Sequence, residues 1–176
     1  ELWSVAVSPN DKFILFGDGD DGSIRVHHLD RSITPTGPYP HVKRIKSSDE
    51  KGKRTAEGKA LFLGPNGHSE EVDVLLFSRD KKKLFSASRD YTIKIWNVEK
   101  QDDPEAWFVA RTLVGHKDIV ATLSESPTGE YLVSGGGWGI DAKDKKARVW
   151  DVKTGVEVRS LPGHEAMITS AMFLDM

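Results

Sequence analysis

Two stretches of the sequence each contain a histidine, a serine and an aspartate, the residue types of a hydrolytic triad, followed by a tryptophan. The residues are His68, Ser86, Asp90 and Trp96 in the first stretch and His116, Ser134, Asp144 and Trp150 in the second. In both, the tryptophan follows the aspartate by six residues. A serine nucleophile needs an exposed hydroxyl beside an oxyanion site. Because the whole set is duplicated, tryptophan included, we interpret it as structural and predict no catalytic residue and no enzyme.

Other residues of ligand-binding type lack the spacing that a site requires. The acidic run 18–22 has Gly22 and Leu29 where the EF-hand order needs a fifth-position ligand and a twelfth-position glutamate. His27 and His28 are neighbours on a predicted strand, so their side chains face opposite ways and cannot share a metal. We predict neither a metal nor a cofactor.

The first set lies on a stretch with the pattern of half-buried β-strands. Between residues 67 and 97, apolar residues occupy alternate positions of short runs, as at Val72 and Val74. Polar turn residues at 79–81 and 88–90 separate the runs. The pattern predicts three antiparallel strands, with a fourth supplied by the segment before them.

This stretch is one copy of a repeat. A Gly-His pair occurs at 67–68, 115–116 and 163–164, with a spacing of 48 residues each time, and Trp-Asn at 96–97 recurs as Trp-Asp at 150–151. A repeat of this length that runs from Gly-His to Trp-Asp resembles the WD40 family of β-propeller repeats. The resemblance implies an all-β propeller with about three and a quarter blades of four-stranded antiparallel sheet, roughly half of a seven-bladed ring.

The resemblance also implies that each His-Ser-Asp-Trp set, which we call a tetrad, is a buried hydrogen-bonded network within one blade. The first repeat departs from this pattern. Asp21 precedes His27 by six residues, but Phe16 replaces the serine and no Gly-His pair precedes it. We therefore expect an incomplete network there.

The repeats predict how the chain is divided. The predicted units are a partial blade without its leading strand at 1–29, an insert at 30–58, a complete blade at 59–97, a connection at 98–106, a complete blade with a hairpin insertion (135–143) at 107–151, and the start of a further blade at 152–176. The last unit is expected to end on a strand at 168–173. Since the chain opens on Glu1 without an initiator methionine, we expect it to be part of a longer protein.

Composition agrees with an intracellular all-β protein, cytoplasmic or nuclear. The 176 residues include no cysteine, carry a formal net charge of −2 and are 38% hydrophobic, so a disulfide framework is excluded. No apolar run approaches the roughly 20 residues of a membrane-spanning helix, and the opening residues lack the pattern of a signal peptide.

The predicted insert is basic, with eight Lys or Arg against three Asp or Glu between residues 31 and 59. Its candidate contact residues are Lys43, Arg44, Lys46, Lys51, Lys53 and Arg54. One interpretation is a solvated loop. Another is a docking segment for an acidic partner, nucleic acid included, and a third is a nuclear-targeting signal.

In the resembled family, the loops that enter the first strand and those that join the second strand to the third usually carry the partner site. Carried over by position, the candidates here are Trp3, Asp20, Glu71, Asp73, Arg89, Ile119, Ala121, Trp138, Lys143, Met167 and Thr169. We favour Trp3, Arg89 and Trp138, because aromatic and arginine side chains are enriched at interface hot spots. The structural alternatives are that Trp3 packs near the central channel and that Trp138 folds onto its own hairpin.

The sequence therefore predicts a non-catalytic protein–protein interaction scaffold, a rigid propeller that displays loop residues to partner peptides or domains. Two alternatives stay open: an accessory propeller of a nucleic-acid-containing or ribosomal assembly that contacts phosphates through the insert, and a ligand-binding or enzymatic propeller. The expected partners are other proteins or peptides. A second copy of this chain, or the rest of a longer chain, is a candidate for completing the ring. Nucleic acid is a further candidate partner, and a membrane is not.

Overall fold

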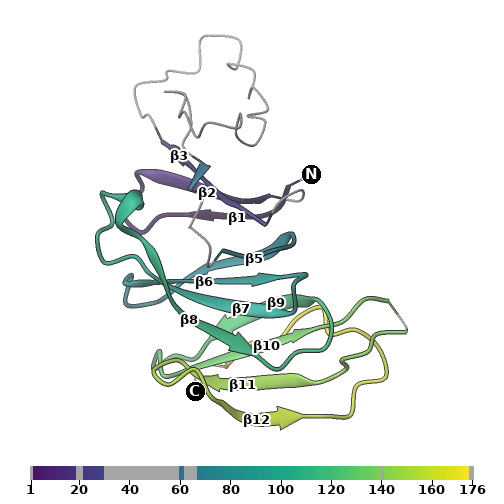
Figure 1. Cartoon of the computed structure of the whole chain (residues 1–176). Helices are drawn as coiled ribbons and strands as arrows, with labels where there is room; N and C mark the ends of the chain where they lie inside the picture. The colour runs from purple at the N-terminus through teal and green to yellow at the C-terminus, as the bar shows by residue number, and fades with distance from the viewer. Residues whose placement is uncertain (1, 19–21, 30–59, 62–66, 140, 175–176) are drawn as a thin grey trace.

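The computed structural model describes residues 2–18, 22–29, 60–61, 67–139 and 141–174. Within these ranges the strands form three four-stranded antiparallel sheets, which follow one another in chain order (Figure 1). We call them the first, second and third blades. The all-β, four-stranded architecture predicted from the repeats is confirmed.

Each blade is a meander of four strands. The first blade has β1 (Leu2–Val7), β2 (Phe13–Asp18), β3 (Ile24–His28) and β4 (Ala60–Leu61). The second has β5 (Val72–Phe77), β6 (Lys83–Ser88), β7 (Thr92–Asn97) and β8 (Phe108–Val114). The third has β9 (Val120–Glu125), β10 (Tyr131–Gly136), β11 (Ala147–Asp151) and β12 (Glu157–Leu161). A short 3₁₀ helix, η2 (Pro104–Ala106), precedes β8.

The same turn closes the first hairpin of every blade. A serine hydroxyl accepts the backbone N–H five residues later, over 2.9 Å at Ser8, 2.8 Å at Ser78 and 3.0 Å at Ser126. The third residue after each serine has a positive φ, at Asp11 (55°), Lys81 (61°) and Gly129 (73°). Serine favours such turns because its short side chain bonds nearby backbone groups. The serine therefore recurs in the sequence because the same turn geometry recurs in each blade.

Apolar cores fill the spaces between neighbouring blades. One cluster includes Phe13 and Leu15 of the first blade with Leu84 and Trp96 of the second. The other joins the second blade to the third through residues such as Phe85. Since successive side chains of a strand point to opposite faces, Leu84 and Phe85 serve different cores. The second blade is thus buried on both sides, and each large side chain that it buries contributes about 1.5–3 kcal/mol.

The strands group into blades differently from the prediction. Ala60–Leu61 was expected to lead the blade at 59–97, but it pairs with β3, in the register Ile24↔Leu61. Likewise, β8 completes the second blade by pairing with β7, and β12 completes the third by pairing with β11. Pairing between neighbours in the chain allows either grouping, and the structure pairs each of these strands with the strand before it and not with the strand after it. The strand before each Gly-His therefore belongs to the preceding sheet, and the first blade has four strands.

Residues 168–173, predicted to be a strand, form no strand in the structure. The segment instead lies along the third blade, where the backbone N–H of Ile168 donates to Gly136 O (2.9 Å) and that of Ala171 donates to Thr122 Oγ1 (3.2 Å). A regular strand needs a continuous ladder of backbone partners. The described residues supply only these two bonds to it.

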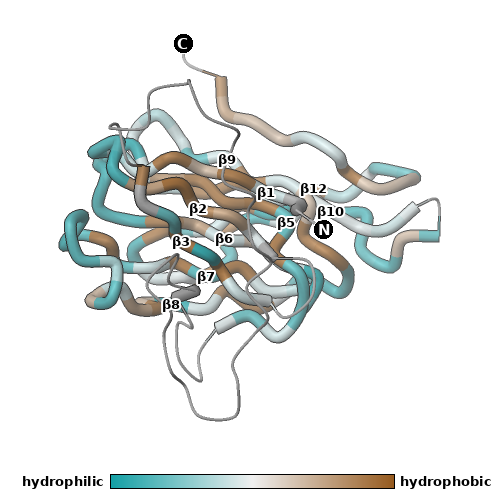
Figure 2. The backbone as a smooth tube through the Cα atoms, turned by 90° about the horizontal axis from the view of Figure 1, so that it is seen from above, coloured by the Kyte–Doolittle hydropathy of each residue, from teal (hydrophilic) through white to brown (hydrophobic). Residues whose placement is uncertain are grey.

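Hydrophobic residues concentrate in the strands and hydrophilic residues at the turns, as the view in Figure 2 shows. Among the described residues, the structure has no helix with the length and apolar character that crossing a bilayer requires.

Candidate functional site

The tetrad of the second blade is a closed hydrogen-bonded chain. Trp96 Nε1 donates to Ser86 Oγ (2.8 Å), and His68 Nε2 lies 2.7 Å from the same oxygen. His68 Nδ1 lies 2.8 Å from Asp90 Oδ2. One proton assignment satisfies every group: Ser86 donates to Nε2, and the Nδ1–H of His68 donates to Asp90.

The tetrad of the third blade has the same geometry. Trp150 Nε1 donates to Ser134 Oγ over 2.8 Å. His116 lies 2.7 Å from that oxygen through Nε2 and 2.9 Å from Asp144 Oδ2 through Nδ1. Both serines are fully buried, with 0% exposure. A substrate therefore has no route to either hydroxyl, which removes the triad interpretation of these residues.

Electrostatics hold the two tetrad aspartates in the charged form. Burial works against ionisation of Asp90, but hydrogen bonds from His68 and Thr92 prevail and hold its pKa well below the usual range. Burial likewise opposes ionisation of Asp144, and Arg148 and the backbone N–H of Lys117 lower its pKa. Burial lowers the pKa of His116, so its neutral form is favoured. In each of these two blades, the tetrad joins two loops. Its aspartate lies in the connection between the second and third strands, and its histidine lies in the loop that leads into the first strand.

Arg148 is a residue of this network that the sequence reasoning missed. Its Nη2 donates to both carboxylate oxygens of Asp144 (3.1 and 2.9 Å), and its Nη1 donates to Glu157 Oε2 (3.0 Å). It stands two residues before Trp150, so period-2 alternation puts both side chains on one face of β11. That spacing was the signal available in the sequence.

The first blade has an aromatic contact where the other blades have the serine and tryptophan. The ring of Phe16 packs edge-on against His27, with centroids 5.5 Å apart. Burial, with the nearby charge of Arg25, lowers the pKa of His27. The aspartate expected to join this set, Asp21, lies outside the described residues.

The turn that carries Asp90 also positions Arg89, one of the favoured candidates. Its backbone N–H donates to Glu71 O (3.0 Å), which ties the β6–β7 turn to the loop entering β5. Its Nε lies 3.3 Å from both carboxylate oxygens of Asp73, and its Nη1 lies 3.5 Å from Glu71 Oε1. Burial raises the pKa of Asp73 despite the neighbouring Arg89 charge.

Arg89 also contacts Trp138, a favoured candidate from the next blade. The guanidinium carbon lies 5.4 Å from the centroid of the indole ring, and Trp138 is 62% exposed. A cation–π contact at an exposed site contributes about 0.5–1 kcal/mol. The contact means that Trp138 reaches across to the second blade. We call Glu71, Asp73, Arg89 and Trp138 the Arg–Trp cluster.

Five further candidates lie outside this cluster and differ in exposure. Ile119, Ala121 and Met167 are half-buried, whereas Lys143 and Thr169 are exposed. The backbone N–H of Lys143 donates to Asp118 Oδ2 (2.8 Å), which links the β10–β11 connection to the loop entering β9. Asp118 is buried and holds this connection in place. Like Arg148, it was not identified from the sequence.

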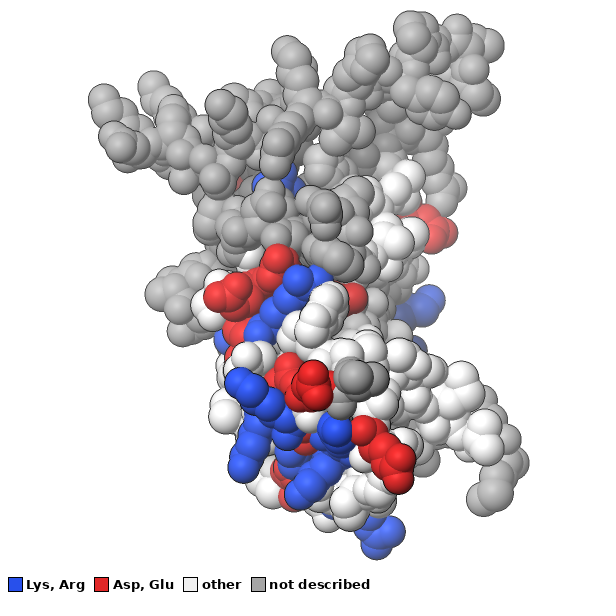
Figure 3. All heavy atoms as spheres, turned by 90° about the vertical axis from the view of Figure 1, so that its right-hand side faces the viewer, with Lys and Arg blue, Asp and Glu red and all other residues white. Residues whose placement is uncertain are grey.

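Several predicted positions cannot be compared with the structure. Asp20 and the basic residues Lys43, Arg44, Lys46, Lys51, Lys53 and Arg54 lie outside the described residues, and Trp3 is described only as part of β1. Figure 3 views the side of the molecule at which β1 begins, where acidic and basic side chains lie close together over the described surface. Among the described side chains, no three His, Cys, Asp or Glu groups gather in a way that would hold a metal.

Comparison with known proteins gives consistent similarities. A WD40 profile, described as "WD domain, G-beta repeat", matches residues 1–28, 61–97 and 107–151. A chromatin assembly factor 1 subunit FAS2 homolog from Oryza sativa subsp. japonica is 36% identical over 139 residues, covering 78% of this chain and 26% of the relative. The WD repeat-containing protein pop2 of Schizosaccharomyces pombe is 32% identical over 114 residues, covering 57% of this chain and 15% of the relative.

Solved structures show the same fold. The WD40 repeats of RRP9 superpose with a TM-score of 0.66 at 23% identity, over 97% of this chain and 42% of that one. This chain therefore spans about a quarter or less of the length of these two curated relatives and less than half of that solved chain.

Proposed function

The chain belongs to the WD40-repeat family, and on that basis we propose that it is a protein-interaction scaffold whose partner-binding face is centred on the Arg–Trp cluster. The blades keep the loops rigid, and the loops present their side chains to a partner peptide or domain. Binding to such a face loses little conformational entropy because its residues are already held in place.

The contact between Arg89 and Trp138 is the observation that carries this proposal. It joins loops of two blades, so a partner seated there would contact both. Arg89 is fixed from its own blade by Asp73 and Glu71. The mostly exposed indole of Trp138 offers a large contact area, and tryptophan and arginine are enriched at binding hot spots.

A non-catalytic role fits the burial of Ser86 and Ser134, whose hydroxyls are the hydrolytic candidates in the sequence. The alternative role in a nucleic-acid-containing assembly rests on the basic insert, which lies outside the described residues. It stays a prediction, as does the intracellular location.

Substitution of Trp138 tests the proposal. Proteins retained by the immobilised wild-type chain would be quantified by mass spectrometry beside those retained by Trp138→Ala and Arg89→Ala. We expect the specific partners to bind Trp138→Ala at least about tenfold less, as for a hot-spot residue. Phe108→Ala is the matched control, because Phe108 is also an exposed aromatic residue (55%) but lies on β8. Equal retention by the wild-type chain and Trp138→Ala would contradict the proposal.

A further inference from the structure

A groove lies between the second and third blades, away from the Arg–Trp cluster. Its volume is about 480 Å³. It is lined by Lys83, the first residue of β6, and by Asn97, the last residue of β7. Arg89 directly follows the other end of β6. The groove and the cluster therefore occupy opposite ends of the second blade.

The floor of the groove is apolar. Ile95 and Val152, both of the core between these blades, reach its surface while remaining almost fully buried, at 3% and 5% exposure. Tyr131, 38% exposed, and Ala110 extend this apolar lining toward the rim. A single apolar side chain of a partner would find contacts here without any rearrangement of the core.

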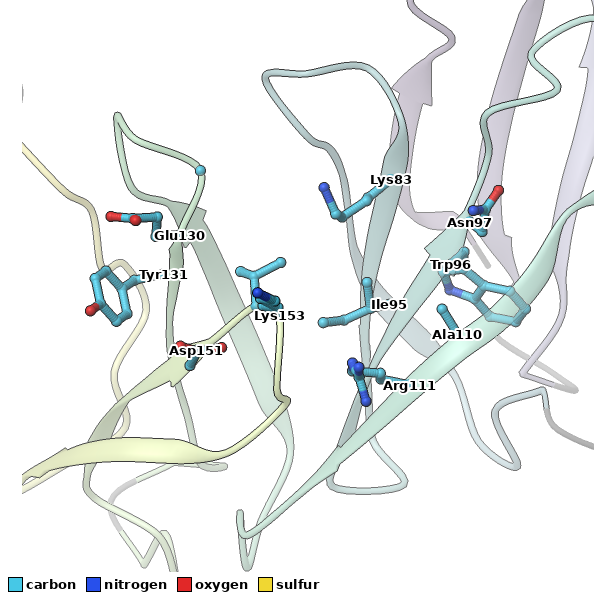
Figure 4. A pocket seen from close by; sticks show the side chains of 12 residues that line it. Lys83, Ile95, Trp96, Asn97, Ala110, Arg111, Glu130, Tyr131, Asp151 and Lys153 are labelled. Carbon is cyan, nitrogen blue, oxygen red and sulfur yellow. The ribbon is translucent and has the colours of Figure 1, made fainter.

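Basic side chains line both walls. Figure 4 shows Lys83 and Arg111 on the side of the second blade, with Lys153 and Asp151 on the side of the third. Lys83 is already paired with Asp80, at 2.7 Å. Within the described part of the chain, neither Arg111 nor Lys153 forms an ion pair.

Two carboxylates, Asp151 and Glu130, also line the groove, but among the described residues neither forms an ion pair with Arg111 or Lys153. Asp151 Oδ1 accepts the backbone N–H (2.7 Å) and the hydroxyl (2.9 Å) of Thr154, so this carboxylate is engaged in its own turn. Those bonds, with a smaller effect of the nearby Lys153 charge, lower the pKa of Asp151, which keeps it charged. Glu130 is exposed at the rim. Arg111 and Lys153 are therefore available to a negatively charged ligand.

The alkyl stem of Arg111 lies beside the β11–β12 turn. A Cβ added at Gly155 would lie 3.2 Å from Arg111 Cδ and from Leu113 Cδ2. The β11–β12 turn thus packs on the alkyl stem of Arg111, which leaves the guanidinium at the groove. A guanidinium can bind a carboxylate in a bidentate arrangement while its stem packs on apolar atoms.

We propose that this groove is a second docking site, for a peptide segment in which an apolar side chain is flanked by carboxylates. The apolar side chain occupies the floor over Ile95 and Val152. The carboxylates bind Arg111 and Lys153 on opposite walls. This site is separate from the face proposed above, so the chain would bind two partners at once.

The experiment is a selection of random peptides displayed on phage against the 176-residue chain. We expect a class of the selected peptides to combine an apolar residue with neighbouring Asp or Glu, and to bind an Arg111→Glu/Lys153→Glu variant at least about tenfold more weakly. Synthetic versions with Asn and Gln in place of the acids should lose binding similarly. Backbone amide shifts on titration should change at 110–111, 130–131 and 151–153.

Control variants distinguish the groove from general charge effects and from the Arg–Trp cluster. Lys117→Glu/Lys146→Glu changes the net charge equally at exposed lysines outside the groove, and it should bind the peptides normally. Ala110→Trp, which fills the groove without removing a charge, should abolish binding, whereas Trp138→Ala should not affect it. The proposal is overturned if no peptide is enriched, if the selected peptides lack acids, or if their binding depends on Trp138 rather than on Arg111 and Lys153.

Discussion

The hydroxyl group of Ser86, like that of Ser134, forms hydrogen bonds with two buried side chains, a tryptophan and a histidine. The oxygen accepts the indole N–H and the proton is directed to the imidazole. Without the hydroxyl, a buried donor and a buried acceptor both lose a partner. Leaving a buried polar group unsatisfied costs about 1–3 kcal/mol.

We therefore expect Ser134→Ala to lower the free energy of unfolding by about 1–3 kcal/mol, measured by urea denaturation. The matched control is Ser160→Ala, which removes an exposed hydroxyl on β12 and should change stability by no more than about 0.5 kcal/mol. Equal, small effects of the two substitutions would show that the tetrad contributes little to stability.

Protonation of Asp90 makes the free energy of unfolding depend on pH. Its pKa lies below the ordinary value of 3.8, because the bonds from His68 and Thr92 outweigh the effect of burial. The folded state therefore binds this proton more weakly than the unfolded chain does. The stabilisation is complete above the unfolded pKa and is lost as the pH falls through the folded pKa.

We expect Asp90→Asn to destabilise the chain at neutral pH and to flatten the fall in the free energy of unfolding below about pH 4. Denaturation curves recorded across this range would measure both effects. Glu165→Gln, at an exposed carboxylate, should retain the wild-type profile. An unchanged acid dependence in Asp90→Asn would contradict the assignment.

At the scale of elements, single side chains bind one blade to the next. Glu125, at the end of β9, accepts the backbone N–H of Arg79 from the β5–β6 turn over 2.6 Å. It is 7% exposed, and burial raises its pKa. Between the first and second blades, Ser4 Oγ donates to Val72 O over 2.9 Å. These bonds join each blade to the next through the backbone of the second blade.

Removal of the Glu125 side chain should loosen the junction of the second and third blades. We expect Glu125→Ala to lower the free energy of unfolding by about 1–3 kcal/mol and to speed hydrogen exchange at Arg79. Glu125→Gln keeps a side-chain oxygen as acceptor, so it should preserve most of the stability and of the exchange protection. If the two substitutions were equally harmful, the bond to Arg79 would not be the cause.

At the scale of the whole molecule, both outer flanks expose apolar side chains. Val5 (62%) and Val7 (50%) are exposed on β1, and Met172 (69%) and Leu174 (77%) on the segment after the third blade. This last segment follows the hydrogen bond of Ala171 to the third blade, and Figure 2 shows the chain running on from there to the C-terminus at the edge of the molecule. Exposed apolar surface favours association.

We expect the 176-residue chain to associate in solution, with a mass above the 19.5 kDa of one copy. Light scattering after size exclusion would measure the mass. Val5→Asp/Val7→Asp should shift it toward the monomer, whereas Phe108→Asp on β8 should not. A wild-type chain that is monomeric at all accessible concentrations would exclude association through these flanks.

Much of the architecture was predictable because its signals are local and repeated. Alternating residues mark the strands, and the turn serines mark the hairpins. The resemblance to WD40 repeats implied which four residues meet in each tetrad, and hydrogen bonds join them in both complete repeats. Arg89 and Trp138 were candidates by position alone, and nothing in the sequence indicated that they touch.

The sequence by itself determined the strands and turns of the three blades, and through its resemblance to WD40 repeats the two tetrads, because each depends on residues within one repeat. The tertiary structure decided what depends on contacts between repeats. It assigned β4, β8 and β12 to the preceding sheets, joined Arg89 to Trp138, and formed the groove between Arg111 and Lys153. These features depend on how neighbouring blades pack against one another. The spacing of the repeats in the sequence does not specify which side chains of two blades come into contact.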